Sequence, residues 1–142
     1  MTRREVVELI RAYGNAEQYI DEINEEMQRL KSDIEGMREL TAVTYSDMPK
    51  GSGTGDPTAQ AAQYIIDVYD KRLKELKQRI EAILQKKSLT EELLGRLNAN
   101  EYKVIEARYI NGVKWDYVPG TVYLSRSTCF YYKKKAFEKM CR

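Results

Sequence analysis

The 142-residue chain contains no histidine. Histidine supplies most acid–base catalysis at neutral pH and much of zinc ligation, so its absence removes Ser–His and Cys–His nucleophile pairs and most zinc or non-haem iron sites. No nucleophile in the chain has an evident activating partner. We therefore expect that the protein is not an enzyme and that it has no catalytic residue, no metal site and no cofactor.

Cysteine is scarce, and the chain has no long uninterrupted stretch of apolar residues. Cys129 and Cys141 lie twelve residues apart on one expected helix, which separates them by about 18 Å and is too far for a disulfide. The chain shows no secretory signal at its start and no apolar run near 18 residues. We expect a cytoplasmic protein with reduced thiols and no contact with a membrane.

Charge is nearly balanced overall, at +2, but it is unevenly placed. Residues 1–57 carry 7 basic and 12 acidic side chains, whereas residues 96–142 carry 10 basic and 4 acidic ones. This basic segment also holds nine of the 14 aromatic residues, enough bulk for a compact core of its own. An acidic arm joined to a basic, aromatic-rich head suggests that the head binds a polyanion.

Two long runs of apolar residues alternate at spacings of three and four, the pattern of a helix in a coiled coil. Thr2 followed by Glu5 predicts a capping box at the start of the first helix. Pro57 is compatible with the first turn of the second. The first run comprises Val6, Leu9, Tyr13, Ala16, Ile20, Ile23, Met27, Leu30, Ile34 and Met37, and the second comprises Ala59, Ala62, Ile66, Tyr69, Leu73, Leu76, Ile80 and Ile83.

A stretch rich in turn-forming residues, 41–57, separates the two runs and predicts a Gly-rich loop. Gly51–Gly55 could be imagined to hold a phosphate, but it lacks the Lys-Ser/Thr ending of a Walker A motif, so a turn is favoured. The helices could pair within the chain as a hairpin, which we favour, or across chains as a dimer. Because an apolar stripe rarely stays exposed, we expect a homo-oligomer, most simply a dimer, in either case.

The last 45 residues predict three short helices. Asn98 followed by Glu101 predicts a capped helix near 99–110, and Trp115 and Val118 then supply apolar residues at helical spacing. Ser125 is a good cap for a helix near 126–141. The inward stripe of this helix is Cys129, Tyr132, Ala136, Phe137 and Met140, and its outward positions are Arg126, Ser127, Phe130, Tyr131, Lys134 and Lys135.

We therefore predict an all-α fold in which a coiled-coil helical hairpin, 1–87, precedes a helix-turn-helix DNA-binding domain, 88–142. Arginine can donate two hydrogen bonds to a guanine edge in the major groove, and lysine neutralises phosphate charge. Taken alone, Lys133–Lys135 would favour a merely solvated helix face. Together with the basic segment, they favour duplex DNA as the partner. The candidate DNA-binding residues are Lys114, Ser125, Arg126, Ser127, Thr128, Phe130, Tyr131, Lys134 and Lys135.

This C-terminal pattern resembles the sigma-70 region 4-like helix-turn-helix of phage-encoded transcriptional regulators in the ArpU and RinA group. The stretch Ser46–Asp56 also looks like the linker of their small Firmicutes-phage relatives. Pro119-Gly120 departs from the family, which has a small helix-compatible residue after the position of Val118, and so the first helix of the motif is expected to be distorted or to end early. The residues that carry the resemblance are Glu101, Val104, Ile105, Arg108, Tyr109, Ile110, Gly112, Trp115, Val118, Leu124, Ser125, Arg126, Ser127 and Thr128.

The resemblance implies a sequence-specific DNA-binding regulator of phage late genes, such as packaging or lysis genes, acting in the cytoplasm of a bacterial host. Trp115 and Val118 would hold the first helix of the motif, Leu124 the turn, and Ser125–Thr128 the start of the recognition helix. Two other functions stay open. One is a small-terminase-like packaging component, and the other is a helical adaptor that binds host RNA polymerase without reading DNA.

Overall fold

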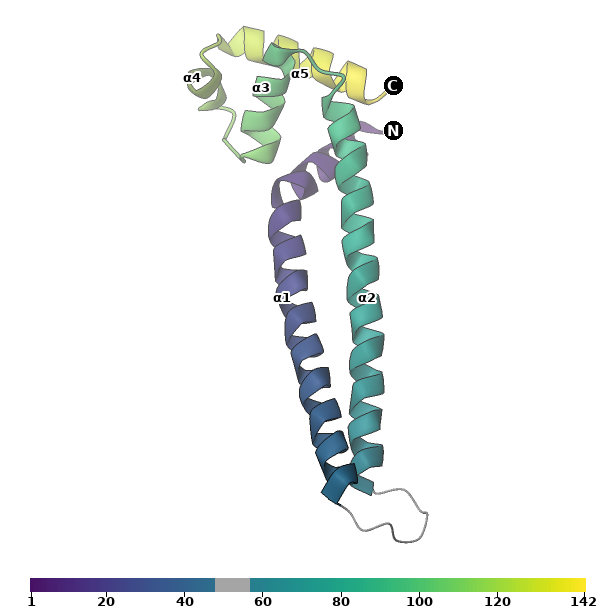
Figure 1. Ribbon diagram of the computed structural model, residues 1–142. Coiled ribbons are helices and arrows are strands. Elements are labelled where there is room, and N and C mark those ends of the chain that lie inside the picture. The colour runs from purple at the N-terminus through teal and green to yellow at the C-terminus, as the bar shows by residue number, and fades with distance from the viewer. Residues whose placement is uncertain (48–56) are drawn as a thin grey trace. The chain divides into compact units, whose positions relative to one another are not determined.

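The computed structural model describes the backbone of residues 1–47 and 57–142 and the side chains of residues 1–40 and 59–142. The expected all-α fold is confirmed, and no strand occurs in these ranges. Two long helices are followed by a set of short ones (Figure 1). The elements are α1 Arg3–Asp47, α2 Pro57–Leu94, α3 Ala99–Ile105, the π-helix η1 Glu106–Ile110, α4 Val118–Val122 and α5 Arg126–Met140.

Both long helices begin close to the expected positions. Glu5 N donates to Thr2 Oγ1 (3.2 Å) and Thr2 N donates to Glu5 Oε2 (2.8 Å), so the predicted capping box is confirmed. α2 begins at Pro57, but α1 continues to Asp47, and the expectation of a loop from residue 41 was wrong at that end. The backbone there keeps its helical hydrogen bonds until the Pro- and Gly-rich stretch begins. The rest of the expected loop, including Gly51–Gly55, lies outside the described residues.

The chain divides into two compact units. The head unit combines Met1–Tyr19 with Ala82–Arg142, and the hairpin unit is Ile20–Glu81. α1 and α2 each contribute to both units, and α2 passes through residues 87 and 88 without a break. The expected division into a hairpin domain, 1–87, and a helix-turn-helix domain, 88–142, stays a prediction.

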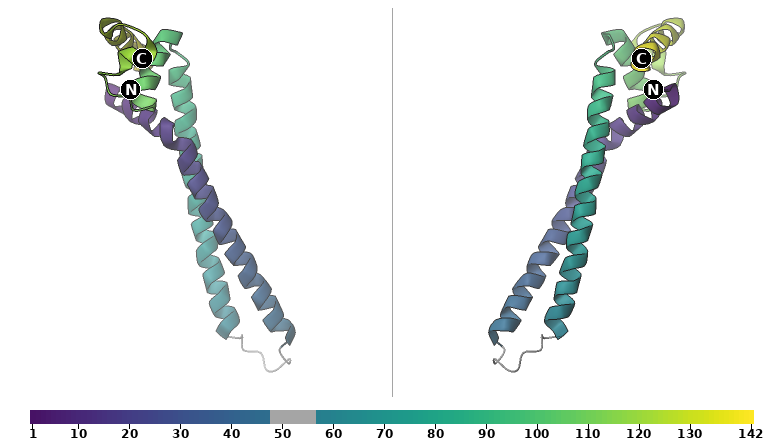
Figure 2. Two further views of the ribbon diagram at one scale, coloured as in Figure 1. Left: turned by 90° about the vertical axis from the view of Figure 1, so that its left-hand side faces the viewer. Right: turned by 90° about the vertical axis from the view of Figure 1, so that its right-hand side faces the viewer.

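In the hairpin unit, α1 and α2 run antiparallel and pair within the chain (Figures 1 and 2). Met27 and Ile34 of α1 are buried against Ile66, Leu73 and Leu76 of α2. Arg72 of α2 also donates through Nε to Glu26 Oε1 of α1 at 3.1 Å. The alternation of three and four thus forms an intrachain hairpin, as we favoured.

The head unit has its core where the start of α1 meets the end of α2, α3 and α5. Its buried residues are Val6, Ile10, Leu93, Leu94, Ile105, Tyr109, Ala136, Phe137 and Met140. Ile10 is fully buried although it lies off the predicted stripe of α1. The first turns of α1 are covered from more than one side, whereas the coiled-coil pattern assumes a single partner.

A buried carboxylate joins the ends of α3 and α5. Glu101 is only 1% exposed, and it forms the predicted capping box with Asn98, each backbone N donating to the other side chain at 2.9 Å. Lys139 Nζ donates to Glu101 Oε1 at 2.5 Å. Burial raises the pKa of Glu101, but the hydrogen bonds from Asn98 and Lys139 lower it by more, so the pKa lies below its ordinary value.

The helix expected near 99–110 is α-helical only to Ile105 and continues as the wider turn η1. Asn111 N donates to Glu106 O at 2.8 Å, the spacing of a π-helix. At this point α1 comes very close, because a Cβ placed on Gly14 would lie 2.9 Å from Ile110 O. Gly14 therefore lets the backbones of α1 and η1 approach each other.

Gly14→Ala is expected to destabilise the protein, although alanine favours helices. The added methyl group would force α1 away from η1, with an expected net loss of about 1–2 kcal/mol in the free energy of unfolding, measured by urea denaturation. The matched control is Gly36→Ala in the same helix, where a Cβ would have no neighbour within 4 Å. That change should stabilise by about 0.5–1 kcal/mol, and equal effects of the two substitutions would contradict the close approach.

Glu101→Gln is expected to lower the free energy of unfolding at neutral pH by about 1–2 kcal/mol, because glutamine can accept from Asn98 but leaves Lys139 without its ionic partner. A carboxylate with a lowered folded pKa stabilises above its unfolded pKa, about 4.3, and that stability is lost as the pH falls through the folded pKa. The gap between the wild type and the variant should therefore close in acid. Glu5→Gln tests the same motif at an exposed site and should cost less than about 0.5 kcal/mol. A gap that does not depend on pH would refute the ionic role of Glu101.

Candidate nucleic-acid interface

The two faces of α5 have different environments. Cys129, Ala136, Phe137 and Met140 are buried, and Tyr132 is half-buried, as its spacing predicted. Ser125 caps the helix, since Thr128 N donates to its Oγ at 3.3 Å and the two hydroxyl oxygens lie 2.6 Å apart. These contacts fix the rotation of α5 and therefore which side chains face outward.

The outward face keeps most of the predicted DNA-binding residues accessible. Lys114 and Ser125, which precede α4 and α5, are exposed, while Thr128 and Lys135 are half-buried. The exposed members on α5 itself are Arg126, Ser127, Phe130, Tyr131 and Lys134. The structure thus gathers a cationic, hydroxyl-bearing and aromatic surface on one helix.

Contacts within the head occupy some of these side chains. Arg126 Nη2 lies 4.0 Å from Asp116 Oδ1, and both side chains remain largely exposed. Lys135 Nζ lies 3.6 Å from Glu138 Oε2, whereas Lys134 forms no ion pair with any described residue. Lys134 is therefore the most available cation of the face.

Phe130 has a more structural position than the sequence indicated. It stacks on Trp115, with ring centroids 5.2 Å apart and the planes at 23°. It is 40% exposed. The stack ties the turn before α4 to α5.

Pro119-Gly120, where the sequence departs from the pattern of the phage regulators, lies in the first turn of α4. A proline there removes an amide that has no partner within the helix in any case. α4 is short and ends at Tyr123, which adopts a left-handed conformation (φ 59°) and is 92% exposed. Sequence reasoning did not single out Tyr123, because nothing in the pattern marks a non-glycine residue for that conformation.

A group of cations around Trp115 was also missed. Lys133 Nζ lies 4.7 Å from the centroid of the Trp115 ring, and Arg108 Cζ lies 5.7 Å from it. The sequence shows Lys133 only as the first member of a lysine run. Its contact with Trp115 depends on how α5 packs against the turn before α4.

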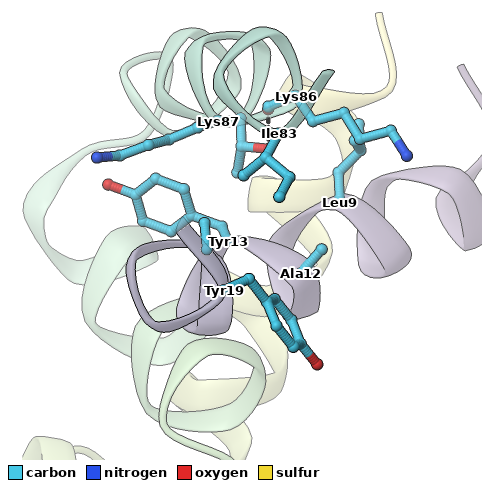
Figure 3. Close-up of a pocket in the computed structure, with 9 residues that line it drawn as sticks. Leu9, Ala12, Tyr13, Tyr19, Ile83, Lys86 and Lys87 are labelled. Carbon is cyan, nitrogen blue, oxygen red and sulfur yellow. Dashed lines mark hydrogen bonds between the residues drawn. The ribbon is translucent and has the colours of Figure 1, made fainter. Parts of the chain in front are cut away.

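The head unit also contains a hollow between the start of α1 and the end of α2 (Figure 3). It measures about 130 Å³ and is largely apolar. At its edge, Tyr13 donates to Glu91 Oε1 at 3.4 Å, and Lys87 pairs with Glu17 at 3.5 Å. Acidic side chains thus already partner Tyr13 and Lys87 at the edge of the hollow. Figure 3 shows Leu9, Ala12 and Tyr13 on one side and Ile83, Lys86 and Lys87 on the other.

The described part of the chain contains neither a metal-binding cluster nor a membrane-spanning helix. No group of histidine, cysteine, aspartate or glutamate side chains there could hold a metal ion. No helix there combines the length and the apolar character needed to cross a membrane.

No family model, no curated protein and no solved structure matches the chain. The resemblance to phage regulators therefore rests on the residues quoted above.

Proposed function

We propose that the protein binds duplex DNA through the outward face of α5. The observation that carries this proposal is the clear separation of the two faces, with Cys129 and Met140 fully buried and Arg126, Ser127 and Lys134 exposed. An exposed helix with cations and hydroxyls on one side fits the width and the chemistry of the major groove.

The roles follow from position along α5. Arg126 and Ser127 lie in the first turn, where a recognition helix contacts base edges, and the Arg126 guanidinium can donate twice to guanine. Lys134 lies two turns later, where α5 would run past the phosphate backbone. Asp116, next to Arg126, holds the guanidinium only loosely, so DNA can take its place.

The resemblance to phage regulators adds a biological role to this proposal. The protein would be a phage-encoded transcriptional regulator of late genes, acting in the cytoplasm of a bacterial host, and it could contact host RNA polymerase. A dimer would present two recognition helices to a pair of half-sites. These finer assignments are inferred from the residues shared with the family.

Arg126→Ala should weaken binding to the preferred DNA sequence by about 1–3 kcal/mol and relax the preference at one base position. The preferred sequence would first be recovered by selecting bound genome fragments with the purified protein, and affinities would then be measured by fluorescence anisotropy. The control is Lys77→Ala, which removes an exposed cation of the hairpin unit. If Arg126→Ala binds every fragment as the wild type does, α5 does not read bases.

Lys134→Ala should weaken binding to all duplexes alike, because a phosphate contact carries no sequence information. The slope of log affinity against log salt should fall by about one, since one fewer counterion is released. Anisotropy titrations at several salt concentrations measure both effects. An unchanged slope would remove Lys134 from the interface, and an absence of duplex binding by the wild type would favour the protein adaptor.

A further inference from the structure

Four cations surround the aromatic cluster of the head unit. Tyr109 packs edge-on against both Phe137 (5.5 Å) and Trp115 (6.4 Å). Arg3 Cζ lies 4.5 Å from the centroid of Phe137, and Arg11 Cζ lies 5.9 Å from that of Tyr109. With Arg108 and Lys133 over Trp115, cations from three separate parts of the chain meet around one group of rings.

These cations have no acidic counterpart in the described part of the protein. None of the four forms an ion pair there, although other arginines of the chain do, such as Arg72 with Glu26. Arg108 Nη1 donates to Val113 O at 3.2 Å, but Arg108 Nε is buried and has no hydrogen-bond acceptor among the described residues. Buried polar groups nearly always have partners, so an unpaired guanidinium nitrogen calls for an explanation.

The electrostatics agree with an excess of positive charge. Burial lowers the pKa of Lys133, and the nearby positive charges of Arg3 and Arg108 lower it further. Like charges held together repel each other, and an anion bound among them offsets that repulsion. The rings offset only part of it, because cation–π attraction is modest at sites that water can reach.

We propose that Arg3, Arg108 and Lys133 bind a phosphate group beside Trp115. A phosphate presents several oxygens, so it can accept from cations that approach from different directions. A single carboxylate has fewer oxygens for three donors. The phosphate could belong to the DNA backbone or to a small phosphorylated molecule.

The location favours the DNA backbone. Trp115 stacks on Phe130, so the cation cluster adjoins the outward face of α5. A phosphate held there would place the backbone of a duplex next to the recognition helix. This form of the inference rests on the proposed function, whereas binding of a small phosphate does not.

The chain has one tryptophan, so its fluorescence reports directly on this site. Inorganic phosphate, added at constant ionic strength against chloride, should change the emission of Trp115 in a saturable manner. Lys133→Gln should raise the dissociation constant about tenfold, the scale of one lost charge-assisted hydrogen bond. Lys77→Gln makes the same change of net charge in the hairpin unit and should leave the titration unchanged.

A second titration uses a short duplex containing the preferred sequence and compares Lys133→Gln, Arg3→Gln, Arg126→Ala and Lys77→Gln. Weaker duplex binding by Lys133→Gln and Arg3→Gln places a backbone phosphate at the site, even if inorganic phosphate alone does not bind. Saturable phosphate binding without that effect assigns the site to a small phosphorylated molecule.

The proposal is overturned if inorganic phosphate gives no saturable change and both glutamine variants bind the duplex as Lys77→Gln does. Arg126→Ala separates this result from failure of the proposed function. If Arg126→Ala alone weakens duplex binding, α5 reads DNA without the phosphate site. Thermal denaturation of each variant confirms that the head is folded.

Discussion

The packing of one face of α5 against α3 and the first turns of α1 is the constraint on which the rest of the head depends. Phe137, Ala136 and Met140 join the core that includes Val6, Ile10 and Ile105, and this burial fixes the rotation of α5. Near the C-terminal end of α5, Lys139 donates a hydrogen bond to the buried Glu101. Everything proposed for the outward face follows from that rotation, because a helix whose inward stripe is fixed has no freedom in what it presents to solvent.

Local signals predicted much of this fold. The alternation of three and four identified both long helices, and the capping residues Thr2, Asn98 and Ser125 marked helix starts that the structure confirms. Each of these signals lies within one or two helical turns, where the chemistry of a few neighbouring residues decides the outcome. For the same reason the inward and outward positions of α5 could be assigned from spacing alone.

The features that sequence reasoning missed depend on distant parts of the chain. Ile10 is buried because the head covers α1 on a side that a coiled-coil stripe leaves open. The wide turn of η1 accompanies the close approach of Gly14 to Ile110, which no local pattern records. Tyr123 adopts a left-handed conformation at the end of α4, and the cations around Trp115 come from residues as far apart as Arg3 and Lys133. Contacts of this kind exist only after the elements have packed.

The lysine run of α5 shows how packing separates identical residues. Each step along a helix turns the side chain by about 100°, so Lys133, Lys134 and Lys135 meet three environments. Lys135 pairs with Glu138, Lys134 lies in solvent, and Lys133 is held over Trp115 beside other cations. Keeping Lys133 charged in this position raises the free energy of the folded state. An anion that relieves this repulsion binds the folded head and not the unfolded chain, so its binding and the stability of the head are thermodynamically linked.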